Sequence, residues 1–159
     1  MLNYSSAGGV SDDVTIKAAA KLAMQSTGHK VIDTPHLVLA VVRRINDRLA
    51  GKSILVETFG TTHNHMYVAI ADMPKPNLQP INGRIVLYTE AAQMVLDVAR
   101  QYVDASEGQL SYPDCLVAAI AVGGDESFVF MMDKLGIDRE EFTAKMTALL
   151  EQHGVLARV

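Results

Sequence analysis

The chain has 159 residues, of which 49% are hydrophobic and 20% are charged, and its formal net charge is −4. This composition indicates a globular protein with a sizeable core and excludes a disordered chain. The 14 lysines and arginines are scattered and no apolar run reaches the roughly 18 residues of a membrane span, so we expect neither a nucleic-acid nor a membrane partner. The N-terminus lacks a signal sequence and Cys115 is the sole cysteine, which together favour a cytoplasmic location.

The chain begins with ten residues, 1–10, that are polar and contain two glycines, and they predict a flexible leader. Ser11 is the expected N-cap of a first helix that ends near Gly28. The next segment, TPHLVLAVVRR at 34–44, has a threonine suited to the N-cap position and Pro35 directly after it. Its remaining residues are almost wholly apolar, which predicts a short helix that is buried on most sides.

Two further helices follow in this half of the chain. The third is expected to start at Asn46 or Asp47 and to end at Gly60. The fourth is expected to start at Thr61 or Thr62 and to end just before a proline. Its apolar residues recur at four- and three-residue spacing, which is typical of a helix with one face in the core.

The second half repeats this order after a proline-rich linker at 74–84. Further helices are predicted over residues 89–108, 112–122, 125–136 and 138–152. Pro113 lies 78 residues after Pro35, and Gly136 lies 76 residues after Gly60, so the two halves keep nearly one offset. We therefore expect an all-α fold of eight helices, built as two pseudo-twofold four-helix repeats that form one domain. The repeats cover residues 11–73 and 85–153, and 154–159 form a tail.

The small-residue helix ending in Gly28, the following TPHLVLAVV, the turn FGTT and the later LVAAIAVGGDESFVFMMDKLGID resemble the Clp N-terminal domain, also called the Clp repeat domain. The resemblance extends over roughly residues 11 to 153. Members of that family are two pseudo-repeats of four helices at the front of AAA+ unfoldases. The resemblance implies a non-catalytic domain that docks substrates or adaptor proteins, with Clp ATPase or protease subunits as further possible partners.

The sequence departs from the family at the start of each central helix. Members that recognise phosphorylated arginine have a glutamate there that holds the guanidinium, whereas this chain has Pro35 and Pro113. A proline side chain cannot accept a charge-assisted hydrogen bond, which counts against arginine-phosphate recognition of that kind. No ATPase region follows in this sequence, and whether the chain is the front of an unfoldase, a stand-alone Clp-repeat regulator or a structural oligomerisation module stays open.

Three motifs that could indicate chemistry have simpler interpretations. AGKS at 50–53 lacks the earlier glycine and the strand of a nucleotide-binding loop. His63 and His65 point in different directions on a helix, without a third ligand for a metal. Cys115 lies in an apolar helix and is interpreted as a buried hydrophobic residue. We therefore predict no catalytic residues, no metal site and no cofactor.

The predicted docking surface is a shallow apolar groove between the two halves, bordered by the loops that precede the central helices. A flexible methionine is suited to such a surface, and the neighbours Met131 and Met132 cannot face the same way, so one of them is expected to be exposed. The predicted docking residues are Asp33, Pro35, His36, Ser111, Pro113, Asp114, Phe128 and Met131.

Overall fold

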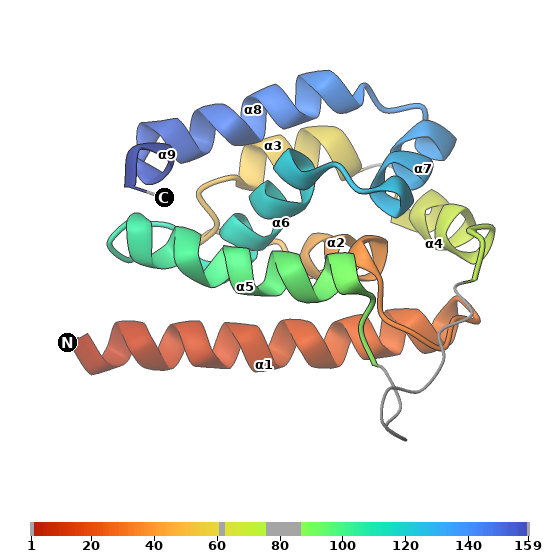
Figure 1. Cartoon of the computed structure of the whole chain (residues 1–159), viewed down its shortest axis with the longest axis horizontal. Helices are drawn as coiled ribbons and strands as arrows, with labels where there is room; N and C mark the ends of the chain where they lie inside the picture. Colours follow the sequence, from red (N-terminus) through yellow and green to blue (C-terminus); the bar gives the residue numbers. More distant parts are fainter. Residues whose placement is uncertain (1, 61–62, 76–86, 159) are drawn as a thin grey trace.

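The computed structural model describes residues 2–60, 63–75 and 87–158, and the described part of the chain is all-helical (Figure 1). The helices are α1 (Leu2–Ser26), α2 (Thr34–Val42), α3 (Lys52–Phe59), α4 (His63–Ala71), α5 (Glu90–Ala105), α6 (Tyr112–Gly123), α7 (Glu126–Leu135), α8 (Arg139–Gln152) and α9 (Val155–Arg158). The first eight follow the predicted order. The ninth is a short helix in the predicted tail, and Val155 within it is fully buried.

The two apolar helices predicted from sequence form the centre of the fold. Every residue of α2 is buried, and α6 is buried from Tyr112 to Ala121. In Figure 1, α1 lies along one side of the molecule and α8 along the opposite side, with α6 between them. Helix α6 contacts α1, α2, α5 and α8. An apolar helix surrounded in this way removes all its faces from water, which explains why neither central segment shows an amphipathic pattern.

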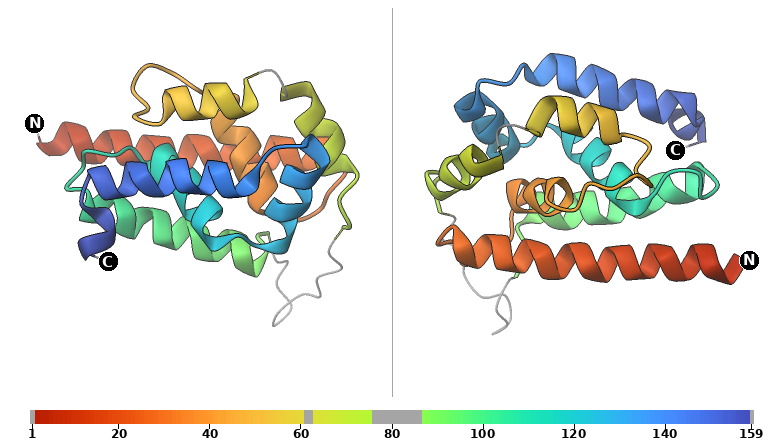
Figure 2. Two further views of the ribbon diagram at one scale, coloured as in Figure 1. Left: turned by 90° about the horizontal axis from the view of Figure 1, so that it is seen from above. Right: turned by 180° about the vertical axis from the view of Figure 1, so that it is seen from behind.

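The outer helices of each half pack against helices of the other half, and the two contacts are equivalent. Helix α4 of the first half packs on α7 of the second, and α8 of the second half packs on α3 of the first. All three views show α4 and α7 side by side at one end of the molecule (Figures 1 and 2). Because α3 corresponds to α7 and α4 to α8, the two contacts are the same contact seen from either half. The packing therefore has the pseudo-twofold relation that the sequence repeat predicts.

Two predicted helix starts differ from the structure. Helix α1 begins at Leu2, so residues 2–10 are helical and do not form the expected leader, and Ser11 is not an N-cap. Extending an existing helix is much easier than nucleating a new one, so two glycines do not stop it. Helix α3 begins at Lys52 with Gly51 as its N-cap, several residues after the predicted Asn46 or Asp47. The fourth helix begins at His63, and the predicted caps Thr61 and Thr62 lie outside the described residues.

The C-terminal ends of the corresponding helices α1 and α5 agree with the sequence prediction. Gly28 after α1 and Gly108 after α5 both have a left-handed backbone, with φ of 78° and 77°. Glycine adopts this conformation without the steric cost that a Cβ atom brings, so it closes both helices. The halves are also linked by an isolated parallel bridge between Ile32 and Tyr88, which ties the segment before α2 to the segment before α5.

Candidate functional site

A buried polar junction joins the starts of helices from both halves. At its centre is Asp33, the N-cap of α2, whose side chain is 4% exposed. One carboxylate oxygen accepts hydrogen bonds from the Thr34 backbone N–H at 2.8 Å and from the Thr89 hydroxyl at 2.9 Å. The other accepts from the Ser127 hydroxyl at 2.5 Å. Thr89 is the N-cap of α5 and Ser127 lies in the first turn of α7, so one carboxylate connects three helix starts.

Thr34 extends this junction to a second carboxylate. Its hydroxyl donates to both oxygens of Asp125, at 2.9 and 2.8 Å. Burial raises the pKa of Asp125, the Thr34 hydrogen bond opposes this by stabilising the ionised form, and the nearby Asp33 carboxylate raises the pKa further. Thr34 was predicted to be the N-cap of α2. Asp33 takes that position, because its carboxylate reaches the free N–H groups of the first turn, and the threonine hydroxyl is used to bridge the halves.

Asp114 makes the corresponding contact in the opposite direction. Its carboxylate accepts from the backbone N–H of Ala50 and from that of Gly51, both at 2.9 Å, and from the Ser111 hydroxyl at 2.9 Å. Asp114 is fully buried in α6, whereas Gly51 is the N-cap of α3. The unpaired N–H groups and the dipole at a helix start stabilise a carboxylate without a neighbouring cation. Each central helix therefore contacts the start of the other half's third helix.

His36 completes the junction as a neutral side chain. Its Nδ1 accepts from the Asp33 backbone N–H at 2.9 Å, and together with the Asp33 side chain this makes a capping box. Its Nε2 lies 3.2 Å from the Thr27 hydroxyl, to which it donates in the neutral form. Burial lowers the pKa of His36 from 6.5 to about 4, with the neighbouring His29 adding to the effect.

The lowered pKa of His36 makes folding stability depend on pH. Between pH 6.5 and 4 the unfolded chain binds a proton on this histidine while the folded chain does not. The contribution of the neutral His36 to the free energy of unfolding is therefore complete above about pH 6.5 and is lost as the pH falls toward 4. The loss over this pH range amounts to about 3 kcal/mol of unfolding free energy.

The predicted docking residues lie mainly in the interior. Asp33, His36 and Asp114 belong to the polar junction, and Pro35 and Pro113 are buried in the first turns of α2 and α6. Ser111 is the N-cap of α6 and is half-buried. A side chain in the interior cannot contact a partner protein unless the fold opens. Asp33 accepts hydrogen bonds from hydroxyls at helix starts of the other half, and Asp114 accepts from backbone N–H groups at such a start. No sequence pattern reveals these distant partners.

The two apolar docking residues are also interior. Phe128 and Met131 are fully buried, and so is Met132, so the expectation that one of the paired methionines is exposed is wrong. Helix α7 packs against α2, α4 and α8, so more than one of its faces is buried and adjacent residues can both be interior. The ring centroids of Phe128 and Phe142 lie 6.4 Å apart, and Phe142 makes an edge-to-face contact with Phe59 at a centroid distance of 5.3 Å. This aromatic cluster joins α3, α7 and α8.

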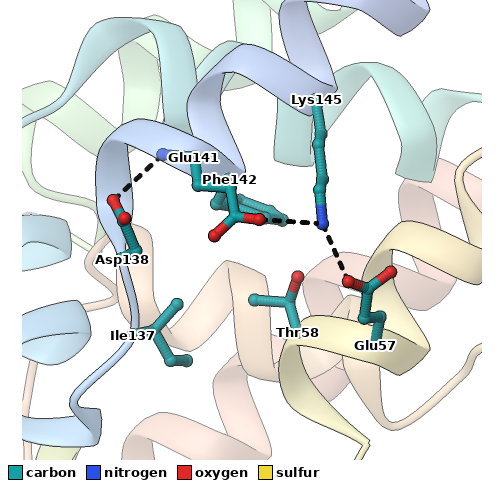
Figure 3. A pocket seen from close by; sticks show the side chains of 7 residues that line it. All are labelled: Glu57, Thr58, Ile137, Asp138, Glu141, Phe142 and Lys145. Carbon is teal, nitrogen blue, oxygen red and sulfur yellow. Dashed lines mark hydrogen bonds and ion pairs between the residues drawn. The ribbon is translucent and has the colours of Figure 1, made fainter.

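A surface hollow does lie between the halves, at a different place from the predicted groove. It has a volume of about 200 Å³ and opens between α3 and the start of α8 (Figure 3). It is lined by Glu57, Thr58, Ile137, Asp138, Glu141, Phe142 and Lys145, and we call it the α3–α8 hollow. Sequence patterns do not predict this hollow, because α3 and α8 are distant in sequence and each carries an ordinary charged outer face. Asp138 and Glu141 lie at the start of the helix predicted over 138–152, where acidic residues are common.

A second, smaller hollow of about 40 Å³ lies beside α1. Pro113 lines it together with residues of α1, of α2 and of the following loop, including Asp12 and Arg44. Burial raises the pKa of Asp12, while the cations of Arg48 and Arg44 oppose that rise. This hollow holds about one water-sized group, which is too little for a side chain of a partner.

The described part of the chain contains no candidate metal site, and its cysteine is buried. No group of three or more His, Cys, Asp and Glu residues there is placed to hold a metal ion. Cys115 is fully buried, and burial raises the pKa of its thiol to about 12. No single helix among the described ones is long and apolar enough to cross a membrane; only α6 and α7 together reach that length and composition, and they are bent by 95°.

The fold is similar to that of a solved domain from a Clp-associated chaperone. No protein-family model matches this sequence, and no curated protein matches it either. Among solved structures, the fold is similar to the crystal structure of the N-terminal domain of the caseinolytic protease associated chaperone ClpD from Arabidopsis thaliana, with a TM-score of 0.62 and 15% sequence identity. The match covers 87% of this chain and 91% of that chain. The chain thus has an all-α fold like that of a Clp N-terminal domain.

Proposed function

We propose that this protein is a protein-recognition domain of the Clp chaperone and protease system, which docks substrates or adaptor proteins for an AAA+ unfoldase. The observation behind the proposal is the likeness of its fold to the N-terminal domain of a Clp-associated chaperone over nearly the whole of both chains. The resemblance noted in the sequence supports the same assignment. Clp ATPase or protease subunits are further candidate partners.

The arrangement of polar groups supports a binding role in preference to catalysis. The carboxylates of Asp33 and Asp114 are saturated by hydroxyl and backbone donors at helix starts, which is a structural arrangement. The hydrogen-bond partners of the neutral His36 are likewise groups of the protein. A reacting group needs free access to its substrate, and these side chains lack it. We expect no catalysis by this chain and no bound cofactor.

One observation favours an alternative, a structural oligomerisation module. Val14 and Leu22 on α1 are 61% and 60% exposed, and the exposed Ala18 lies between them at four-residue spacing. Residues spaced by four lie on one face of a helix, so α1 presents an apolar stripe to solvent. A second copy that covers this stripe would make the protein a dimer, in which case docking is not needed to explain the exposed surface.

A pull-down from lysate of the source cells separates these possibilities. The purified 159-residue protein is the bait, an unrelated helical protein of similar size and charge is the control, and bound proteins are identified by mass spectrometry. We expect specific recovery of a Clp ATPase, a protease subunit, an adaptor or a set of unfolded clients. Each interaction would then be measured with the purified partner by isothermal titration calorimetry.

The contrary result is equally definite. If the bait recovers only itself, and sedimentation shows a stable dimer that Leu22→Glu converts to a monomer, the docking proposal is rejected in favour of the oligomerisation module. If the protein is a monomer and purified Clp components do not bind it, both assignments fail.

A further inference from the structure

We infer that the α3–α8 hollow binds an arginine side chain from a basic segment of a partner protein. This inference rests on the proposed docking function and identifies where docking takes place and which chemistry the partner provides. The hollow is formed by both halves, since Glu57 and Thr58 come from α3 while Glu141, Phe142 and Lys145 come from α8.

The size of the hollow suits one side chain. Its volume of about 200 Å³ is below the roughly 300–1,000 Å³ of pockets that hold whole small molecules. Figure 3 shows the side chains of α3 and of α8 facing each other across the opening. The T-shaped pair of Phe59 and Phe142, with centroids 5.3 Å apart, packs α3 against α8, so the two walls are held at a fixed separation.

The lining combines an apolar base with a charged rim. Phe142 is 2% exposed and Ile137 is half-buried, and both contribute apolar surface. The rim has three carboxylates, those of Glu57, Asp138 and Glu141, against one ammonium group. A long side chain with an apolar stem and a cationic end matches this arrangement, because its stem packs on the base while its charge stays at the rim.

Lys145 already shows where a cation is stabilised. Its Nζ lies 2.9 Å from Glu57 Oε1 and 3.5 Å from Glu141 Oε1, so one ammonium bridges carboxylates of both halves. Both glutamate side chains are exposed, at 68% and 62%, and ion pairs exposed to this extent contribute little to stability. A cation that binds the two glutamates more strongly can therefore displace the Lys145 ammonium at little cost in stability.

A guanidinium is that better cation. It presents five N–H donors in a planar fork and forms two parallel hydrogen bonds with a carboxylate, whereas an ammonium acts as a point charge. With Lys145 moved aside, Glu57 and Glu141 can each receive hydrogen bonds from one arginine. The rim of the hollow carries three carboxylates and one ammonium, so its formal charge is negative. A negative rim attracts a basic segment and repels an acidic one.

Fluorescence anisotropy with the full chain tests this inference. The probes are fluorescein-labelled nine-residue peptides of glycine, serine and leucine with one central position occupied by arginine, lysine, citrulline or glutamate. Citrulline has the shape of arginine without its charge. We expect the arginine peptide to bind at least about tenfold more tightly than the citrulline peptide, as one good charge-assisted contact provides, and the lysine peptide to bind with intermediate affinity.

Three variants locate the binding on the protein. The double variant Glu57→Gln with Glu141→Gln removes the charge with little change of shape and should weaken arginine-peptide binding at least about tenfold. Lys145→Met removes the competing ammonium but keeps the stem, so it should strengthen binding. Glu151→Gln, an exposed position of α8 outside the hollow, is the matched control and should have no effect. Circular dichroism and thermal unfolding verify that each variant is folded.

The inference is overturned if the arginine and citrulline peptides bind equally, if neither binds at millimolar concentration, or if the double variant binds as the wild type does. The pull-down distinguishes these failures from failure of the docking function. Partners that are still captured by the double glutamine variant would show that docking uses another surface. Loss of all partners from the wild-type bait would reject the proposed function itself.

Discussion

Replacing Asp114 by alanine tests whether the contact between halves stabilises the fold. The carboxylate of Asp114 accepts 2.9 Å hydrogen bonds from the N–H groups of Ala50 and Gly51 and from the Ser111 hydroxyl. In Asp114→Ala the buried Gly51 N–H loses its partner, at a cost of about 1–3 kcal/mol, while Ala50 is exposed and can bind water. The hydrogen bond from the Ser111 hydroxyl is lost as well, whereas removal of a buried charge offsets part of the cost. We therefore expect the free energy of unfolding to fall by about 3 kcal/mol in total.

Two companion variants make this expectation specific. Asp114→Asn keeps one oxygen for the Gly51 N–H but directs an NH₂ group at another donor, so we expect an intermediate loss of about 1–2 kcal/mol. Asp138→Ala is the matched control, because Asp138 is an exposed N-cap with a single hydrogen bond to the Glu141 N–H at 3.1 Å. Loss of such a cap costs about 1 kcal/mol.

Urea unfolding at pH 7, followed by far-ultraviolet circular dichroism, measures these losses as changes in the free energy of unfolding. A domain of this size is stable by about 5–15 kcal/mol, so Asp114→Ala should remain folded in buffer. If Asp114→Ala is no less stable than Asp138→Ala, the reciprocal contact of the central helices does not contribute as the geometry indicates.

Three other predictions concern the same interior. His36→Asn keeps an acceptor for the Asp33 N–H and removes the titrating ring, so the stability difference between wild type and variant should shrink by about 3 kcal/mol from pH 7 to pH 4; a constant difference in urea unfolding would contradict the lowered pKa. A Cβ on Gly51 would lie 3.1 Å from Asp114 Oδ1 and 3.2 Å from Leu149 Cδ2, so Gly51→Ala should lower stability by about 1–3 kcal/mol, and an unchanged thermal midpoint would refute this. The buried Cys115 thiol, with its pKa raised to about 12, should react with a disulfide reagent in 6 M guanidinium within the mixing time and orders of magnitude more slowly in buffer; equal rates would show that it is accessible.

Much of the helix pattern could be predicted from local sequence because its causes are local. The apolar segments that became α2 and α6 are buried on all sides, as their composition requires. Thr89 caps α5 by accepting from the Ala92 N–H, and Asp138 caps α8 by accepting from the Glu141 N–H; each lies at the first residue of the helix predicted over 89–108 or 138–152. Capping and helix closure depend on residues within one turn of each other, so a sequence contains the necessary information.

Errors arose where a residue's role depends on a distant segment. Thr34 was expected to cap its own helix, but its hydroxyl donates to Asp125, 91 residues later. Met131 and Met132 were expected to differ in exposure, and both are buried because several helices surround α7. The leader is an error of a different, local kind: it was expected from composition, but helix α1 extends through these residues to Leu2 because extending a formed helix is easier than nucleating one.

By itself, the sequence of this protein determined the number, order and type of its main helices, their duplication, and the apolar character of the two central ones. These properties follow from periodicity, proline and glycine positions and capping residues, which act over a few positions along the chain. Only the tertiary structure decided that the polar residues before the central helices are interior, and that Glu57 and Glu141 of opposite halves meet around Lys145. The physical reason is that burial and charge pairing depend on which surfaces the packing of α3 against α8 brings together, and that packing is a property of the whole fold.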